Sequence, residues 1–140
     1  MKTARGFTLV ELLVVISIIG ILATLVTANL NSARSRARDA QRKSDLKSIE
    51  TGLRLYYNDN GTYPIESALP WGDIWTVGNT TYMQKFPQDP LAPEVTYEYV
   101  LDATGDSFTL SACLENASDS QGVTAVGITC SSNWMFQVQQ

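Results

Sequence analysis

Residues 6–33 read GFTLVELLVVISIIGILATLVTANLNSA, and this stretch decides the architecture of the chain. From Leu12 to Ala33 it contains no Asp, Glu, Lys or Arg. A helix needs about 20 apolar residues to cross a bilayer, so the run is long enough to span one. A secretory signal has a shorter apolar core of about 7 to 15 residues, followed by a cleavage site. The run therefore predicts a membrane-spanning helix that stays on the protein.

One carboxylate, that of Glu11, lies inside this apolar stretch. An ionised acid at membrane depth costs about 3 kcal/mol even on the milder insertion scales, so it must be protonated, reach the interface or pair with a cation. A glutamate that only reaches lipid headgroups is the simplest interpretation. A pair at the helix end or with a neighbouring copy would instead set the axial offset between subunits, because unpaired buried charges are heavily penalised.

A short leader, residues 1–6, precedes the apolar run and carries Lys2 and Arg5. The hydrophobic stretch starts directly after Gly6. A cut between Gly6 and Phe7 would leave the whole helix on the product, which is the reverse of ordinary signal removal.

The junction Gly6-Phe7-Thr8-Leu9-Val10-Glu11-Leu12 resembles the class III signal of type IV prepilins and of the pseudopilins of type II secretion. The resemblance implies that a membrane aspartyl peptidase cuts after Gly6 and methylates the new amino terminus at Phe7. It also implies that Glu11 acts in assembly between subunits. The chain departs from the family pattern at Ala28, where proline is often found, so we expect a straighter helix.

The helical pattern continues beyond the apolar run. Residues 31–57 contain no proline, and Leu46, Ile49 and Leu53 form a stripe at helical spacing. Gly61 is suited to a left-handed cap, so we expect one helix from Phe7 to about Asn58. The predicted organisation is a leader over 1–6, a transmembrane or filament-core helix over 7–33, an amphipathic helix over 34–58 and a globular head over 59–140.

Charge divides the chain. Residues 1–54 carry a net charge of +5 and residues 55–140 a net charge of −9, for a total of −4. A basic band follows the apolar run, with Arg34, Arg36, Arg38, Arg42 and Lys43. It reads as a solvated helix face that also touches lipid phosphates, or as a surface for the acidic heads of neighbouring subunits. A nucleic-acid site is not predicted, because no aromatic stacking residues are interleaved with the band.

This band conflicts with the positive-inside rule, which alone would place the head in the cytoplasm. The family resemblance implies the opposite orientation, with the leader inside. Cys113 and Cys130 are the only cysteines, and two thiols near the end of an exported chain favour one disulfide over two reduced buried thiols. A disulfide in turn requires an oxidising compartment, which also places the head outside the cytoplasm. The pair resembles the carboxy-terminal disulfide loop of many pilins.

The head is predicted to be a small α+β unit. Residues 95–101 and 108–114 alternate apolar and polar side chains around a turn that contains Gly105, which is typical of a hairpin. Residues 58–93 read as a loop, and a third strand is expected within 123–130. Segments 56–64 and 82–90 resemble the small heads of pilins like the major pseudopilin. A sheet packed on the Leu46–Leu53 stripe would give the pilin-like ladle, with a long helix and a small antiparallel sheet.

Catalytic motifs are absent from the sequence. It has no histidine, no paired-cysteine metal motif and no phosphate-binding glycine loop. We therefore expect that the protein is not an enzyme. No cofactor is predicted. A Ca²⁺ ion in the head is the single weak alternative, through oxygens of Asp102, Asp106, Asn116 and Asp119, although their spacing fits no loop signature.

We therefore expect the structural subunit of a type IV pilus-like filament for adhesion, motility or DNA uptake. The expected partners are further copies of the chain, the prepilin peptidase and methyltransferase, and the inner-membrane assembly machinery. The subunit would begin as a single-pass inner-membrane protein and end in a surface pilus. The first alternative is a major pseudopilin-like subunit of a periplasmic secretion pseudopilus. The second is a monomeric, membrane-tethered binding domain.

Overall fold

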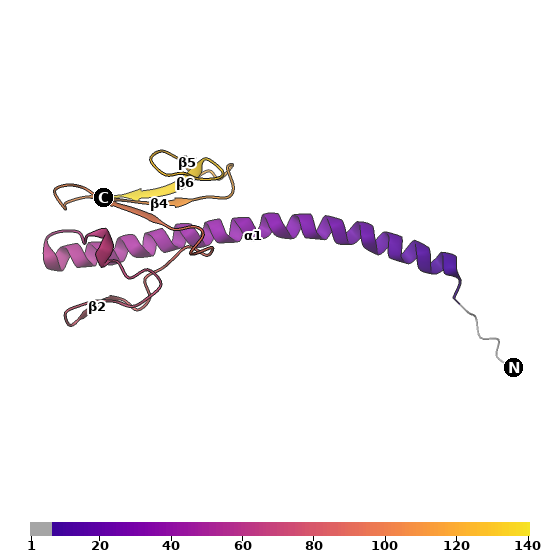
Figure 1. Ribbon diagram of the computed structural model, residues 1–140, viewed down its shortest axis with the longest axis horizontal. Helices are drawn as coiled ribbons and strands as arrows, with labels where there is room; N and C mark the ends of the chain where they lie inside the picture. The colour runs from indigo at the N-terminus through magenta and orange to yellow at the C-terminus, as the bar shows by residue number, and fades with distance from the viewer. Residues whose placement is uncertain (1–6) are drawn as a thin grey trace. The chain divides into compact units, whose positions relative to one another are not determined.

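The computed structural model describes residues 7–140 of the chain, which divides into two units at the boundary between Ser35 and Arg36. One long helix enters both units and is followed by a short 3₁₀ helix and six strands (Figure 1). The elements are α1 (Leu9–Asn60), η1 (Glu66–Ala68), β1 (Trp75–Val77), β2 (Thr80–Met83), β3 (Glu98–Leu101), β4 (Phe108–Cys113), β5 (Val123–Thr124) and β6 (Trp134–Gln139). The α+β fold class is confirmed.

In the first unit, α1 exposes its apolar side chains on all sides. Its most apolar window has a mean hydropathy of 2.8, with none of it buried. The hydroxyls of Ser17, Thr24 and Thr27 donate to carbonyls of the preceding turn at 2.7–2.8 Å. These polar groups are therefore satisfied within the helix, as a lipid environment requires.

The helix ends where the sequence predicts. Asn60 is its last residue, and Gly61 takes a φ of +75° while its amide donates to the carbonyl of Tyr57 at 2.7 Å. A left-handed residue at this position is the ordinary way to stop a helix, and glycine adopts it without steric cost.

In the second unit, the main sheet is antiparallel with the strand order β3-β4-β6-β5. The predicted hairpin is confirmed as β3 and β4, with Tyr99 opposite Leu110. The expected third strand is shorter than predicted, since β5 holds only Val123 and Thr124. Sequence reasoning missed β6, which pairs with both β4 and β5 and has Phe136 opposite Ala112. Its signal was the alternation of Phe136 and Val138 with two glutamines.

The segment predicted as a loop contains a second, two-stranded sheet formed by β1 and β2. Its turn has Gly78 at a φ of +60°, the glycine position of a tight hairpin turn. The hairpin approaches α1 closely at Gly52, where a Cβ would lie 2.8 Å from the sulfur of Met83. In Figure 1, the end of α1 lies between this hairpin and the main sheet.

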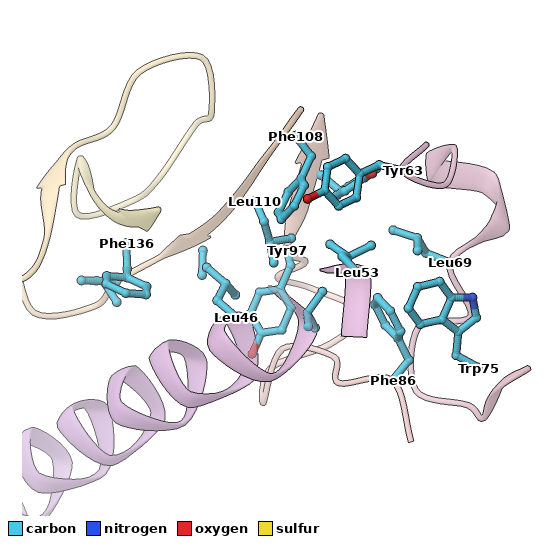
Figure 2. Packing of buried hydrophobic residues seen from close by; sticks show 14 residues of the cluster. Leu46, Leu53, Tyr63, Leu69, Trp75, Phe86, Tyr97, Phe108, Leu110 and Phe136 are labelled. Atoms are coloured by element: carbon cyan, nitrogen blue, oxygen red, sulfur yellow. The ribbon is translucent and has the colours of Figure 1, made fainter. Parts of the chain in front are cut away.

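The predicted stripe of α1 forms the centre of the core. Leu46, Ile49 and Leu53 are fully buried against the sheet. Figure 2 shows Leu46 and Leu53 of this stripe on the side of α1 that faces Leu110 and Phe136 from the strands. The rings of Phe86 and Trp75, from the connecting segment, lie beside Leu53. Burying one such aliphatic side chain contributes about 1.5–3 kcal/mol, so this contact holds the sheet on the helix.

Candidate functional site

The start of α1 is a capping box formed by Thr8 and Glu11. The carboxylate Oε2 of Glu11 accepts from the Thr8 amide at 2.9 Å and from the Thr8 hydroxyl at 2.7 Å. The Glu11 amide donates back to the Thr8 hydroxyl at 3.2 Å. This reciprocal arrangement satisfies amides that a helix start leaves without partners. The acid is therefore held by its own helix end in this single chain.

Of the two predicted processing residues, Gly6 and Phe7, the structure describes only Phe7. Gly6 lies outside the described residues. Phe7 is 78% exposed, and in the uncut chain its nitrogen belongs to a peptide bond. Pairing of Glu11 with a Phe7 amine or with a neighbour therefore stays a prediction. Sequence reasoning missed Thr8, whose signal was the Thr-x-x-Glu spacing directly before an apolar run.

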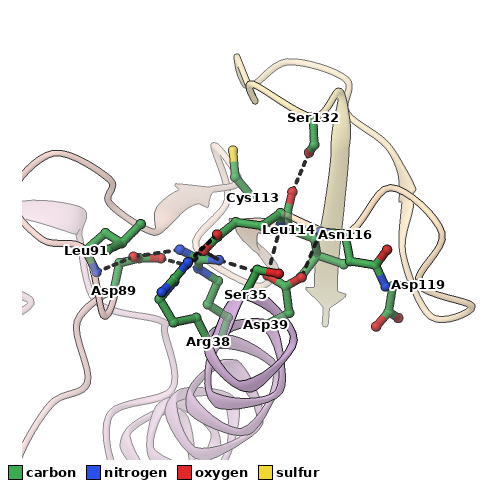
Figure 3. A network of polar contacts seen from close by, with 12 residues as sticks. Ser35, Arg38, Asp39, Asp89, Leu91, Cys113, Leu114, Asn116, Asp119 and Ser132 are labelled. Carbon is green, nitrogen blue, oxygen red and sulfur yellow. Dashed lines mark hydrogen bonds and ion pairs between the residues drawn. The ribbon is translucent and has the colours of Figure 1, made fainter. Parts of the chain in front are cut away.

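The second candidate site is a buried ion network that joins α1 to two loops of the head (Figure 3). Arg42 is 1% exposed and lies at its centre. Its guanidinium donates to Asp89 at 2.7 and 3.1 Å, to Asp39 at 2.8 Å and to Glu115 at 2.9 Å. A buried charge persists only when it is paired and hydrogen-bonded, and Arg42 meets both conditions.

The neighbours of Arg42 extend the network to the backbone. Asp39 accepts from the amides of Glu115 and Asn116, both at 2.9 Å, so a helix side chain caps the loop after β4. Arg38 makes a two-point contact with Glu115 at 2.7 and 2.6 Å, and Lys43 contacts Asp119 at 2.7 Å. These contacts attach residues 115–119 to α1.

This network changes the interpretation of the basic band. Arg38, Arg42 and Lys43 pair with acids of their own head. A solvated face is wrong for Arg42, which is buried. Arg34 and Arg36 remain exposed. Sequence spacing could not separate the two groups, because their partners lie far along the chain.

The network predicts that head stability falls in acid. Hydrogen bonds from Arg38 and Arg42 lower the pKa of Glu115 from 4.5 to about 2. Because the folded-state pKa is the lower one, this contribution is complete above about pH 4.5 and is lost as pH falls towards 2. In thermal unfolding of the full chain in detergent, Glu115→Gln should have a lower Tm than wild type at pH 6, and the two should converge near pH 2. A Tm difference that is constant from pH 6 to pH 2 would contradict this.

Cys113 and Cys130 are bonded to each other, with their Cα atoms 5.4 Å apart. The bond closes the loop that runs from the end of β4 past β5. Closing a loop of this length stabilises the folded state by about 3 kcal/mol, because the bond reduces the conformational entropy of the unfolded chain. Gly122 gives Trp134 room to donate to the carbonyl of Asp119 at 3.1 Å, since a Cβ at residue 122 would clash with that indole nitrogen.

The four residues weighed for Ca²⁺ each have protein partners. Asp102 accepts from the amide and hydroxyl of Thr104, and Asp119 binds Lys43 and the amide of Gln121. Asp106 contacts Tyr57, and Asn116 accepts from Ser118. Over residues 7–140, no three His, Cys, Asp or Glu side chains gather as metal ligands.

An exposed apolar helix, a capped acid at its start and a small disulfide-bonded head together indicate a membrane-anchored protein. Residues 1–27 match the family model described as the prokaryotic N-terminal methylation motif. Type II secretion system core protein G of Klebsiella pneumoniae is 38% identical over 101 residues, which cover 64% of this chain and 71% of that protein. The chain belongs to the type IV pilin and pseudopilin family.

Two further relatives have the same name, type II secretion system core protein G. That of Pseudomonas aeruginosa is 34% identical over 120 residues, covering 78% of this chain and 82% of the relative. That of Vibrio cholerae is 29% identical over 147 aligned positions, covering 98% and 96%. No solved structure matches the chain. The motif supports pilin-like processing and assembly, and the apolar helix supports membrane anchoring.

Proposed function

We propose that this chain is a major pseudopilin-like subunit of a type II secretion system, which polymerises into a periplasmic pseudopilus. The relatives favour this secretion role over the adhesion, motility or DNA-uptake pilus expected first. The observation that carries the proposal is the helix surface. Side chains such as Leu12, Ile16 and Ile19 are more than half exposed. Such a surface needs lipid or identical helices around it.

Processing would prepare the helix for this step. The leader 1–6 is removed after Gly6 by a prepilin peptidase, and Phe7 becomes a methylated amino terminus. Residues 7–33 then form the filament core, residues 34–58 lead into the head, and the head over 59–140 lies outside the cytoplasm. The inner-membrane assembly machinery moves subunits from the bilayer into the filament.

Glu11 would set the register between subunits. Thr8 holds the carboxylate through Oε2, and within residues 7–140 Oε1 accepts no hydrogen bond. A newly formed amine on Phe7 lies about one helical turn away on its own chain, and amines of neighbours arrive during assembly. Because an unpaired charge in an apolar core costs several kcal/mol, only offsets that supply a cation are stable.

Expression with a prepilin peptidase and secretion assembly machinery tests this function. We expect a product that begins at methylated Phe7 and filaments in the sheared fraction. A Gly6→Leu variant should stay uncut, remain in the membrane and form no filaments. A processed chain that stays monomeric in the membrane under these conditions would favour the tethered binding domain and contradict the proposal.

A further inference from the structure

A continuous groove crosses one side of the head, and its lining includes Asp89 of the ion network and Tyr97 of the core. One part is a hollow of about 540 Å³ between η1, the start of β3 and the disulfide loop. A second hollow of about 300 Å³ adjoins it and shares Glu66, Thr96 and Tyr97 with the first. All of its lining residues belong to the second unit, so the groove is a feature of the folded head.

The groove combines an apolar floor with an acidic rim. Trp71, Pro93 and Tyr97 line the smaller hollow, where the Trp71 ring is only partly buried. The rim of the larger hollow carries Glu66, Glu94 and Glu98, and none of them takes part in an ion pair among residues 7–140. The acids of the ion network, in contrast, are all paired with an arginine or a lysine. This rim is therefore an uncompensated negative surface next to aromatic rings.

The matching cations are present on the same chain. Arg34 and Arg36 are exposed, and among the described residues neither forms an ion pair within 4.0 Å. They follow directly after the apolar run that would bring copies of the chain together. Once the leader is removed, residues 7–54 carry a net charge of +3 and residues 55–140 a net charge of −9, which is the same complementarity at larger scale.

The chemistry of the groove favours a guanidinium group over an ammonium group. Arginine is planar, stacks on aromatic faces and binds carboxylates with two parallel hydrogen bonds. Residues two apart on a helix point about 200° away from each other, so Arg34 and Arg36 present guanidinium groups on opposite sides of α1. A helix surrounded by copies can thus reach heads on more than one side.

We propose that this groove is the docking surface for the Arg34 and Arg36 segment of a second copy of the chain. This inference rests on the proposed polymerisation and names the head surface that takes part in it. The partner is identical to the subunit, the contact is heterologous, and such contacts propagate into open filaments. The groove therefore gives each head a specific neighbour, in addition to packing between apolar helices.

A charge-swap series tests the groove in cells that express the prepilin peptidase and the secretion assembly machinery. The variant Glu94→Lys/Glu98→Lys reverses the rim, and Arg34→Glu/Arg36→Glu reverses the cations. Each should reduce the sheared filament yield by about tenfold, equivalent to about 1.4 kcal/mol. The combined four-residue variant should restore most of that yield. The matched control, Asp73→Lys/Asp106→Lys, makes the same charge change outside the groove and should assemble normally.

The outcomes are separable when processing, membrane content and Tm are measured on the same samples. Absence of wild-type filaments would overturn the proposed function itself. Normal filaments from either reversed variant would overturn only the groove. Loss without rescue in the swapped variant would also overturn it, because it would assign the groove to another partner such as the assembly machinery. An equal loss in the control would show a general charge effect and overturn it as well.

Discussion

Replacing Glu11 with valine should abolish filament assembly while leaving membrane insertion intact. Insertion should become easier, because the substitution removes a carboxylate that costs about 3 kcal/mol in the bilayer. Assembly should lose its register, because no charge then distinguishes one axial offset from another. Removing one partner of the proposed buried pair should destabilise the filament by about 3–5 kcal/mol. This free energy corresponds to a loss of filament yield of more than about 100-fold. Sheared filament yield and membrane content measured together check this.

Two further variants separate charge from capping at the same site. Glu11→Gln can still accept the Thr8 hydrogen bonds but carries no charge, so it should fail like the valine variant. Thr8→Ser preserves the hydroxyl that contacts Glu11 and should assemble, whereas Thr8→Ala loses it and should assemble poorly. Normal filaments from Glu11→Gln would show that helix capping, rather than charge pairing, is the role of the acid.

Replacing Arg42 with methionine should destabilise the head by about 3–5 kcal/mol, because it leaves buried carboxylates without a cation. Asp39 and Asp89 are 1% and 3% exposed, so water cannot replace the guanidinium at either acid. Denaturant unfolding of the full chain in detergent, followed by tryptophan fluorescence, measures the change. The variant should also yield few filaments, since subunits with unfolded heads are degraded before assembly.

Arg38→Met is the matched control for this prediction. The Arg38 side chain is 30% exposed and contacts Glu115, which is also partly exposed. Pairs in contact with solvent contribute about 0–1 kcal/mol. Equal destabilisation by the two variants would contradict the claim that burial of Arg42 makes the network important for stability.

The features that sequence reasoning predicted correctly depend on short-range patterns. The apolar run, the stop at Gly61 and the stripe of Leu46, Ile49 and Leu53 are local signals of helix period and capping chemistry. The β3–β4 hairpin is likewise two alternating segments around one turn. In each case the residues that determine the structure are neighbours in the chain.

The misses have different causes. The β1–β2 hairpin and β6 carried usable signals, a Gly-Asn turn and an alternating end segment, that were outweighed by nearby prolines and by the expected terminal loop. The cap by Thr8 also had a local signal. The burial of Arg42 had none, because its partner Asp89 is 47 residues away.

Membrane anchoring, the single long helix and its approximate end follow from the order of residues alone, since helix period, hydropathy and capping act over a few neighbouring positions. Folding of the head selected which cations become buried structural partners and which stay on the surface. It also brought Glu66 and Glu94 to one groove from separate segments. These outcomes depend on which distant segments meet, because a charge is stabilised by the groups around it in space and not by those beside it in the chain.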